Sequence, residues 1–166
     1  MQKIGTLPVL CFDEKSQNIA CFLDSKIHNT ETISQWSGID GKGNYFFSSV
    51  DMFMQMYAER IECALKTGIF LHDNEFIYHA WIEIEHDDED YVLNVSNIHS
   101  KPAYIIKSEQ YYQINNVQKI IQTINFKKMK LHLNTYHRNK GKDSVGEFAK
   151  FLLKPTLRLL KRYLKN

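Results

Sequence analysis

The sequence predicts an α+β domain, in which an antiparallel sheet packs on one core helix, followed by a basic amphipathic helix. Apolar residues recur at helical spacing over residues 45–61, and they alternate with a period of two over residues 75–85. Hairpin-linked strands follow the core helix and helices return only after them, an order typical of α+β proteins. With 166 residues, the chain is expected to form one domain over residues 1–125 and a basic helical tail over residues 126–166.

The core helix over residues 45–61 is predicted by a broad apolar face. Its members are Phe46, Phe47, Val50, Phe53, Met54 and Tyr57. A methionine and phenylalanine stripe of this kind indicates core packing rather than a cofactor site. Residues 37–44 hold three of the seven glycines and are expected to form a loop. Nearer the N-terminus, residues 5–12 predict a short strand, and residues 16–27 predict a helix that Ser16 can cap.

Three strands are expected over residues 62–71, 75–85 and 91–98. The polar run "HDDED" at 86–90 predicts the hairpin turn between the last two. Within residues 75–85, one side of the strand should carry Phe76, Tyr78, Ala80, Ile82 and Ile84, and the other Ile77, His79, Trp81 and Glu83. Residues 101–112 can add a further strand, and residues 117–137 are expected to be helical.

A histidine and an asparagine are expected to be neighbours across this hairpin. If the turn is centred near Asp87–Asp88, His79 lies opposite position 95 or 96, which brings Asn94 within reach of the imidazole. An amide there could hold the ring in one tautomer, as the third member of a nucleophile–His–Asn/Asp set does. We therefore expect the two side chains to be neighbours on paired strands that pack over the core helix.

The segment "HAWIEI…YVLNVS" resembles the second half of the transglutaminase-like core of the papain-like superfamily. The resemblance covers about residues 40–100, including the glycine-rich loop and the core helix. It implies that His79 is the catalytic histidine, Trp81 its aromatic follower and Asn94 the orienting third residue. Asparagine stands in place of the commoner aspartate, although papain-like relatives also use asparagine.

The nucleophile that this resemblance implies is missing from its position. The family carries a cysteine at the start of the core helix, where the helix dipole lowers a thiol pKa. This sequence has Tyr45 there, 34 residues before His79, and a phenol has an unperturbed pKa near 10. We therefore expect a divergent domain that has lost hydrolytic chemistry and binds a peptide or amide-bearing ligand beside His79, with Tyr45 and Trp81 in the binding groove.

Other nucleophiles define the alternatives. Some papain-like enzymes place an oxyanion-hole glutamine shortly before the cysteine, and Gln17 lies four residues before Cys21. This resemblance implies, as an alternative, an active cysteine amidase, peptidase or acyltransferase that uses Cys21 with His79 and Asn94. Cys63 is expected to pack in the core. Ser48 and Ser49 are on the core helix but lie a turn inside it, which favours capping or solvent exposure.

No metal or cofactor is expected. His72, His79 and His86 are spaced by seven residues, but strands divided by turns do not bring them to one face. The three cysteines are too few and too unpatterned for a disulfide framework and predict reduced thiols. No apolar run approaches the roughly 20 residues that span a bilayer, and no signal peptide is expected. These features together predict a cytoplasmic protein.

Charge is divided unequally along the chain. Residues 126–166 hold twelve Lys or Arg against Asp143 and Glu147, a balance of +10, so that residues 1–125 carry −8 of the total +2. The tail is expected to form a helix, kinked at Pro155, with one apolar side and one basic side. The basic side comprises Lys150, Lys154, Arg158, Lys161, Arg162 and Lys165.

Such a tail predicts contact with an anionic membrane surface. Docking on the acidic face of the domain is the alternative, and a third hypothesis is a non-enzymatic adaptor that works through the tail. Nucleic acid is not the expected partner, because aromatic residues interleaved for base stacking are absent from the tail. The tail is also similar to the C-terminal ends of some bacterial glycosyltransferases of envelope polysaccharide assembly, which implies a bacterial protein at the inner face of the cytoplasmic membrane.

Overall fold

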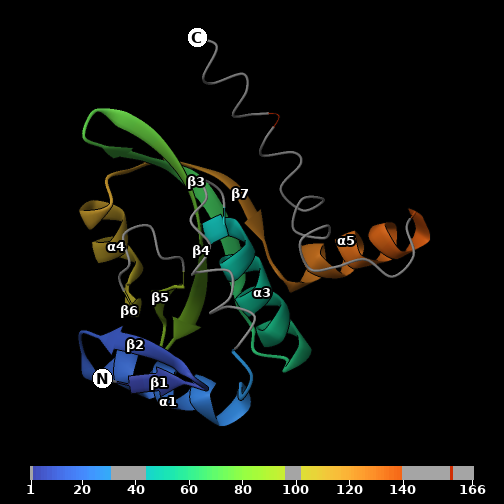
Figure 1. Cartoon of the computed structure of the whole chain (residues 1–166), viewed down its shortest axis with the longest axis horizontal. Helices are drawn as coiled ribbons and strands as arrows, with labels where there is room; N and C mark the ends of the chain where they lie inside the picture. The colour runs from blue at the N-terminus through green and yellow to red at the C-terminus, as the bar shows by residue number, and fades with distance from the viewer. Residues whose placement is uncertain (1, 31–43, 96–101, 140–157, 159–166) are drawn as a thin grey trace.

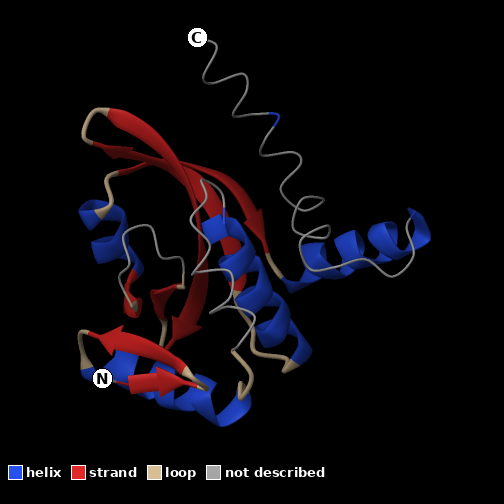
Figure 2. Cartoon of the chain, viewed as in Figure 1, coloured by secondary structure: helices blue, strands red, loops and turns tan. Residues whose placement is uncertain are grey.

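The computed structural model describes residues 2–30, 44–95, 102–139 and 158, and these form an α+β fold (Figure 2). The strands are β1 (Gln2–Ile4), β2 (Leu7–Cys11), β3 (Ala64–His72), β4 (Glu75–His86), β5 (Glu89–Asn94), β6 (Ala103–Lys107) and β7 (Val117–Ile124). The helices of the described residues are α1 (Glu14–Lys26), α3 (Asn44–Ala58), α4 (Ser108–Ile114) and α5 (Phe126–Asn139).

All seven strands belong to one open sheet, in the order β1-β2-β6-β5-β4-β3-β7. The pairing of β2 with β6 is parallel, whereas the other neighbours pair in an antiparallel manner. The predicted α+β class is therefore confirmed, with a larger and mixed sheet. The strands β3, β4 and β5 follow α3 directly in the chain and lie side by side (Figure 1).

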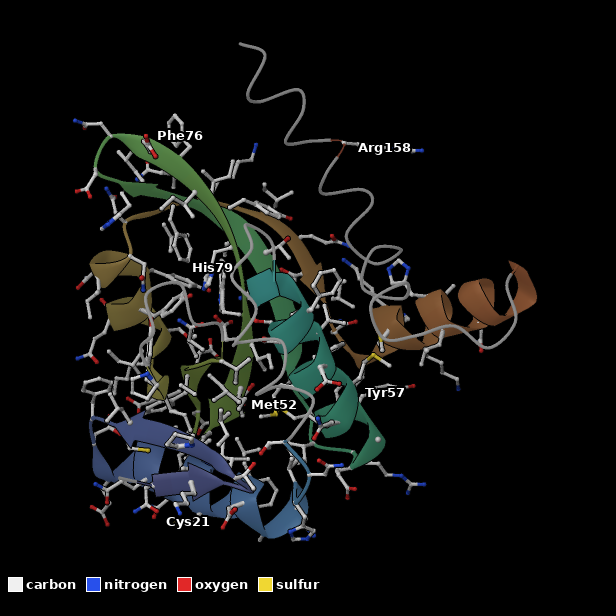
Figure 3. The ribbon with its side chains drawn as sticks, viewed as in Figure 1. Cys21, Met52, Tyr57, Phe76, His79 and Arg158 are labelled. Atoms are coloured by element: carbon white, nitrogen blue, oxygen red, sulfur yellow. The ribbon has the colours of Figure 1, made fainter. Side chains whose placement is uncertain are left out.

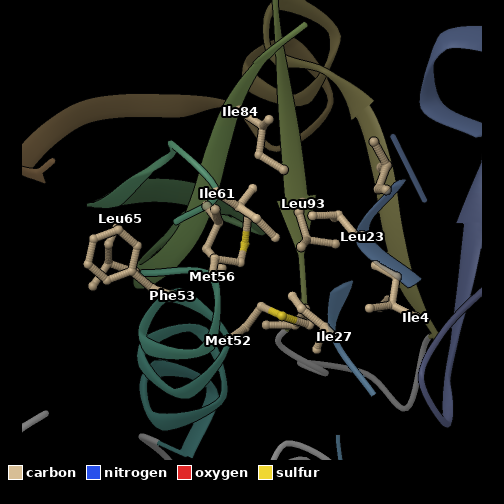
Figure 4. Close-up of a cluster of buried hydrophobic side chains, with 14 of the residues drawn as sticks. Ile4, Leu23, Ile27, Met52, Phe53, Met56, Ile61, Leu65, Ile84 and Leu93 are labelled. Atoms are coloured by element: carbon tan, nitrogen blue, oxygen red, sulfur yellow. The ribbon is translucent and has the colours of Figure 1, made fainter. Parts of the chain in front are cut away.

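The two faces of the sheet are covered by different helices. Ala80 and Ile82 of β4 face the larger core, which α1 and α3 close with Leu23, Met52, Phe53 and Met56 (Figure 4). Trp81, between them on β4, faces a second and smaller apolar cluster that α4 closes. Figure 1 shows α3 and α4 on opposite sides of the central strands. The alternation predicted for this strand is confirmed, and it decides which face each side chain reaches.

The β4–β5 hairpin turn is centred at the predicted position, and it contains two residues. Asp87 and Asp88 occupy it with φ of 51° and 60°, the left-handed values that such a turn requires and that aspartate tolerates. Pairing runs from His86↔Glu89 to Ile82↔Leu93. Continued by one residue, this register sets Trp81 opposite Asn94. The hairpin thus brings Asn94 to the face on which His79 lies.

Helix α1 begins at Glu14, and its N-cap lies three residues before the predicted cap Ser16. Asp13 is the N-cap, and its side chain accepts a hydrogen bond from the backbone N–H of Ser16 at 2.6 Å. Ser16 is the third helical residue, and its hydroxyl accepts from the backbone N–H of Asp13 at 3.0 Å. Ser16 is therefore the second half of a capping box rather than the cap itself.

The helix predicted over residues 117–137 is wrong in its first half. Val117–Ile124 is strand β7, which pairs with β3, and the helix begins only at Phe126. The β-branched residues of Val117–Ile124 favour a strand, which pairs with β3. The Asn125 side chain caps the start of α5, because it accepts a hydrogen bond from the backbone N–H of Lys128 at 3.0 Å. Residues 108–112 belong to α4 rather than to a strand, and strand β1 was not predicted.

The beginning of α5 packs against the domain. The Phe126 ring lies 4.9 Å from that of Tyr57 and 6.1 Å from that of Phe53, and Met129 is fully buried. Phe126 and Met129 of α5 thus pack against residues of the larger core. None of the described helices is long and apolar enough to cross a membrane. Of the basic tail residues, Arg158 is exposed, and Lys150, Lys154, Lys161, Arg162 and Lys165 lie outside the described residues, as does the loop 37–43.

Candidate functional site

The imidazole of His79 and the carboxamide of Asn94 form a buried polar pair. His79 Nε2 lies 3.3 Å from Asn94 Oδ1, and the two residues are 0% and 5% exposed. Their strands β4 and β5 are joined by the hairpin turn, which fixes the register and hence the contact. The neighbourhood expected from the sequence is confirmed.

Aromatic rings enclose this pair. The Phe70 ring lies 4.9 Å from the imidazole and 5.5 Å from the Trp81 ring, and Tyr111 of α4 stacks at 5.5 Å on Trp81. Gly68 pairs with His79 across the strands, and a Cβ there would lie 2.8 Å from Trp81 Cη2. Because Gly68 has no side chain, the Trp81 ring can pack directly against its backbone.

Burial keeps the imidazole neutral. Loss of hydration lowers the pKa of His79 from 6.5 to about 4, and the hydrogen bond to Asn94 opposes this shift only in part. The amide oxygen of Asn94 can only accept a hydrogen bond. Nε2 therefore carries the proton, and the basic lone pair of the neutral ring is on Nδ1.

The pair does not lie over the core helix, contrary to expectation. His79 is on the same face of the sheet as Phe70 and Trp81, whereas α3 packs on the other face with Ala80 and Ile82. Ser49 of α3 donates a hydrogen bond to the backbone oxygen of Ala80 at 3.0 Å. Helix α3 therefore contacts β4 on the face opposite the imidazole. Strand alternation alone could not show which face the helix covers.

Cys21 is not brought to the histidine. Its thiol is exposed on α1 and contacts Gln2 of β1, with Sγ 3.7 Å from Oε1. Strands β2, β6 and β5 separate β1 from β4, which corresponds to about 19 Å at the usual strand spacing. Figure 3 shows Cys21 beside α1 and β1, away from His79 in the centre of the molecule. The triad of Cys21, His79 and Asn94 is therefore not assembled in this structure.

The other two thiols also lie elsewhere. Cys63 directly precedes β3, five residues from Gly68, or about 17 Å along an extended strand, and burial raises its pKa. It packs against the larger core, as expected. Cys11 of β2 donates to the backbone oxygen of Ser16 at 3.4 Å, and burial raises its pKa as well. All three cysteines of the chain lie in its described part, and none is beside His79.

The two residues expected to line a binding groove have different positions. Trp81 is fully buried and its ring lies 6.0 Å from that of Tyr112 on α4, so it packs α4 onto the sheet. Tyr45 is the second residue of α3, and its side chain lies outside the described residues. Ser48 and Ser49 are both fully buried rather than exposed.

Tyr104 connects the buried pair to the surface, and the sequence did not predict it. It pairs with Asn94 across β5 and β6; burial raises the pKa of its hydroxyl, and the Asn94 and Asn115 side chains oppose that rise. Phe12, which is 62% exposed, packs edge-on against the Tyr104 ring at 6.3 Å, and Leu10 of β2 is 38% exposed and pairs with the same residue. We call Leu10, Phe12 and Tyr104 the Tyr104 surface. The contact between Tyr104 and Asn94 depends on the register of β6 on β5, for which hydropathy gives no signal.

A second polar cluster lies further along the same face. Lys66 and Glu83 form an ion pair in which the side chains are only 17% and 11% exposed, and the Tyr112 hydroxyl donates to Glu83 Oε2 at 2.5 Å. This network ties α4 to β3 and β4. Within the described ranges, no group of three or more His, Cys, Asp or Glu side chains could hold a metal ion. Comparison of the chain with protein-family models, curated proteins and solved structures returns no match.

Proposed function

We propose that the chain is a divergent transglutaminase-like domain that binds a peptide or amide-bearing ligand and performs no thiol chemistry. The observation that carries this proposal is the hydrogen-bonded pair of His79 and Asn94 with no cysteine beside it. The succession of α3, β3, β4 and β5 is the order that the resemblance implies. None of the three cysteines lies beside the imidazole, so this proposal includes no thioester intermediate at the site.

Among the described residues of this region, the Tyr104 surface is exposed and can be reached by a ligand. His79 is fully buried, whereas Phe12 and Leu10 are exposed around the partly exposed ring of Tyr104. A tyrosine hydroxyl can both donate to and accept from a ligand amide, and the adjacent rings can bury an apolar side chain of a peptide. Asn94 pairs with Tyr104 across β5 and β6, and His79 is hydrogen-bonded to Asn94.

The active-cysteine alternative is not proposed further, because the thiol of Cys21 is exposed beside the far edge strand. The imidazole acts here as a neutral hydrogen-bonding group rather than as a base for a thiol. Its function in this proposal is to orient Asn94 and, through Asn94, Tyr104.

Binding can be tested with an N-blocked glutaminyl-glycine dipeptide and nitrogen NMR of the imidazole. We expect saturable shifts of the His79 nitrogens in the wild-type protein, weaker binding in Phe12→Ala, and no release of ammonia. Phe22→Ala is the matched control, because Phe22 is 50% exposed but lies on α1. Absence of any saturable shift would refute dipeptide binding, and ammonia release that depends on Cys21 would refute the loss of thiol chemistry.

We also propose that the chain attaches peripherally to an anionic membrane at the cytoplasmic side. The support is the division of charge, with +10 carried by residues 126–166 and −8 by the preceding residues. Basic residues near an anionic surface each add about 1 kcal/mol to binding. Co-sedimentation with vesicles that contain phosphatidylglycerol should therefore occur and weaken with salt, whereas lack of sedimentation at low salt would contradict attachment.

A further inference from the structure

Helix α5 has two different faces along its described side chains. Phe126, Met129 and Leu133 face the larger core, where Met129 is fully buried. Lys127, Lys130 and Leu131 point to solvent, and Leu131 is 62% exposed. Figure 1 shows the helix extending from the end of β7 away from the sheet. One face is thus anchored to the domain while the other is presented outward.

The outward face combines cations with an apolar centre. Leu131 lies three and four residues after Lys128 and Lys127, so these side chains sit on consecutive turns of one face. Lys128 is also exposed, and its ammonium donates to the backbone oxygen of Thr123 at 3.0 Å. The sequence of α5, "FKKMKLHLNTYHRN", contains no acidic residue. An exposed leucine among lysines on a helix is the composition of a helix that lies in a membrane interface.

We propose that the outward face of α5, formed by Lys127, Lys128, Lys130 and Leu131, is a contact surface for anionic lipid. The leucine inserts among the acyl chains, and the lysines meet the phosphates around it. A phosphate backbone of nucleic acid would pair with the lysines but would gain nothing from an apolar residue at the centre. This inference rests on the proposed membrane attachment and assigns part of it to a helix that is itself packed on the domain.

The test uses the full chain and vesicles of phosphatidylcholine with or without phosphatidylglycerol. The variant Lys127→Glu/Lys130→Glu changes two exposed ammonium groups and spares the hydrogen bond of Lys128. The matched control is Lys3→Glu/Lys26→Glu, which changes the same charge at exposed positions on β1 and α1. Leu131→Ser tests the apolar contribution at constant charge.

We expect the α5 charge variant to lower the partition coefficient by at least about twenty-five-fold, from about fivefold for each of two lysines, and Leu131→Ser to lower it severalfold. The partition coefficient of the control variant should fall clearly less than that of the α5 charge variant. If the wild-type protein binds and the α5 variants bind equally well, the assignment to α5 is wrong although attachment stands. If no protein sediments with phosphatidylglycerol while all bind duplex DNA, attachment itself is wrong.

Discussion

His79 Nε2 and Asn94 Oδ1 lie 3.3 Å apart on neighbouring strands, on the face of the sheet that α4 covers rather than the face that α3 covers. A buried polar group is stable only if its hydrogen bonds are made, and the amide supplies the partner for the imidazole N–H. Three aromatic rings, those of Phe70, Trp81 and Tyr111, exclude water around the two groups. The pair is therefore held rigidly and in its uncharged form.

This burial predicts a pH-dependent stability. The unfolded chain protonates His79 near pH 6.5, whereas the folded chain protonates it only at about pH 4. The unfolded state therefore binds more protons between these values, so the stability that His79 contributes is present above pH 6.5 and lost as the pH falls to 4. The loss amounts to about 3 kcal/mol.

Urea unfolding at pH 7 and pH 4 measures this loss in the wild-type protein and in His79→Phe. Between pH 7 and pH 4, the variant should lose about 3 kcal/mol less stability than the wild-type protein. An unchanged pH dependence in His79→Phe would show that the imidazole is not buried in its neutral form.

Gly68 should not tolerate a side chain. A Cβ at this position would lie 2.6 Å from the backbone oxygen of Lys119 and 2.8 Å from Trp81 Cη2. Gly68→Ala must therefore displace either β7 or the indole, and we expect a loss of about 2 kcal/mol in the free energy of unfolding. Gln118→Ala, on the edge strand β7 beside Lys119, is the control and should lower the free energy of unfolding by less than about 0.5 kcal/mol. Equal stability of the two variants in thermal or urea unfolding would contradict the packing of Trp81 over Gly68.

The sequence predicted the parts of this region that depend on local rules. Alternation placed His79 and Trp81 on one side of β4, and two aspartates at the turn set the register that reaches Asn94. The resemblance then supplied roles for His79 and Asn94, which stay predictions. Each of these inferences used residues within about twenty positions of one another.

What the sequence could not predict depends on contacts between distant segments. The face on which α3 packs follows from how the chain crosses the sheet, and neither hydropathy nor spacing records that choice. The same holds for Tyr104, which reaches Asn94 only because β6 lies between β2 and β5. The Gln17–Cys21 spacing suggested a nucleophile, but Cys21 lies on α1 and contacts the edge strand β1, which three strands separate from β4. Residues 117–124 were predicted to be helical because, in so short a segment, their apolar spacing fits both the helical period of 3.6 and the strand period of 2.

The ion pair of Lys66 and Glu83 should be coupled to α4. Removing one charge leaves the other largely buried, so Lys66→Met should destabilise the protein by about 2 kcal/mol or more. The double variant Lys66→Met/Glu83→Leu should cost less than the sum of the two single changes. Urea unfolding of the four proteins gives the coupling energy, and strictly additive effects would show that the pair is not an energetic unit.

The packing of α5 predicts a difference between two apolar residues of the same helix. Met129 is fully buried, and Leu131 is 62% exposed. Met129→Ala should therefore lower the free energy of unfolding by about 2–4 kcal/mol, whereas Leu131→Ala should change it by less than about 0.5 kcal/mol. Similar values for the two variants would mean that α5 does not belong to the folded domain.

Alkylation of each cysteine, followed by mass spectrometry across pH in the wild-type protein and in His79→Phe, tests the central claim most directly. Because Cys11 and Cys63 are partly buried with raised pKa values and Cys21 is exposed beside Gln2, we predict that Cys21 reacts fastest. We also predict that all three rates are the same with and without the imidazole. A thiol that reacts readily below pH 8 in the wild type and slows in His79→Phe would contradict the account, since it would place a cysteine beside His79.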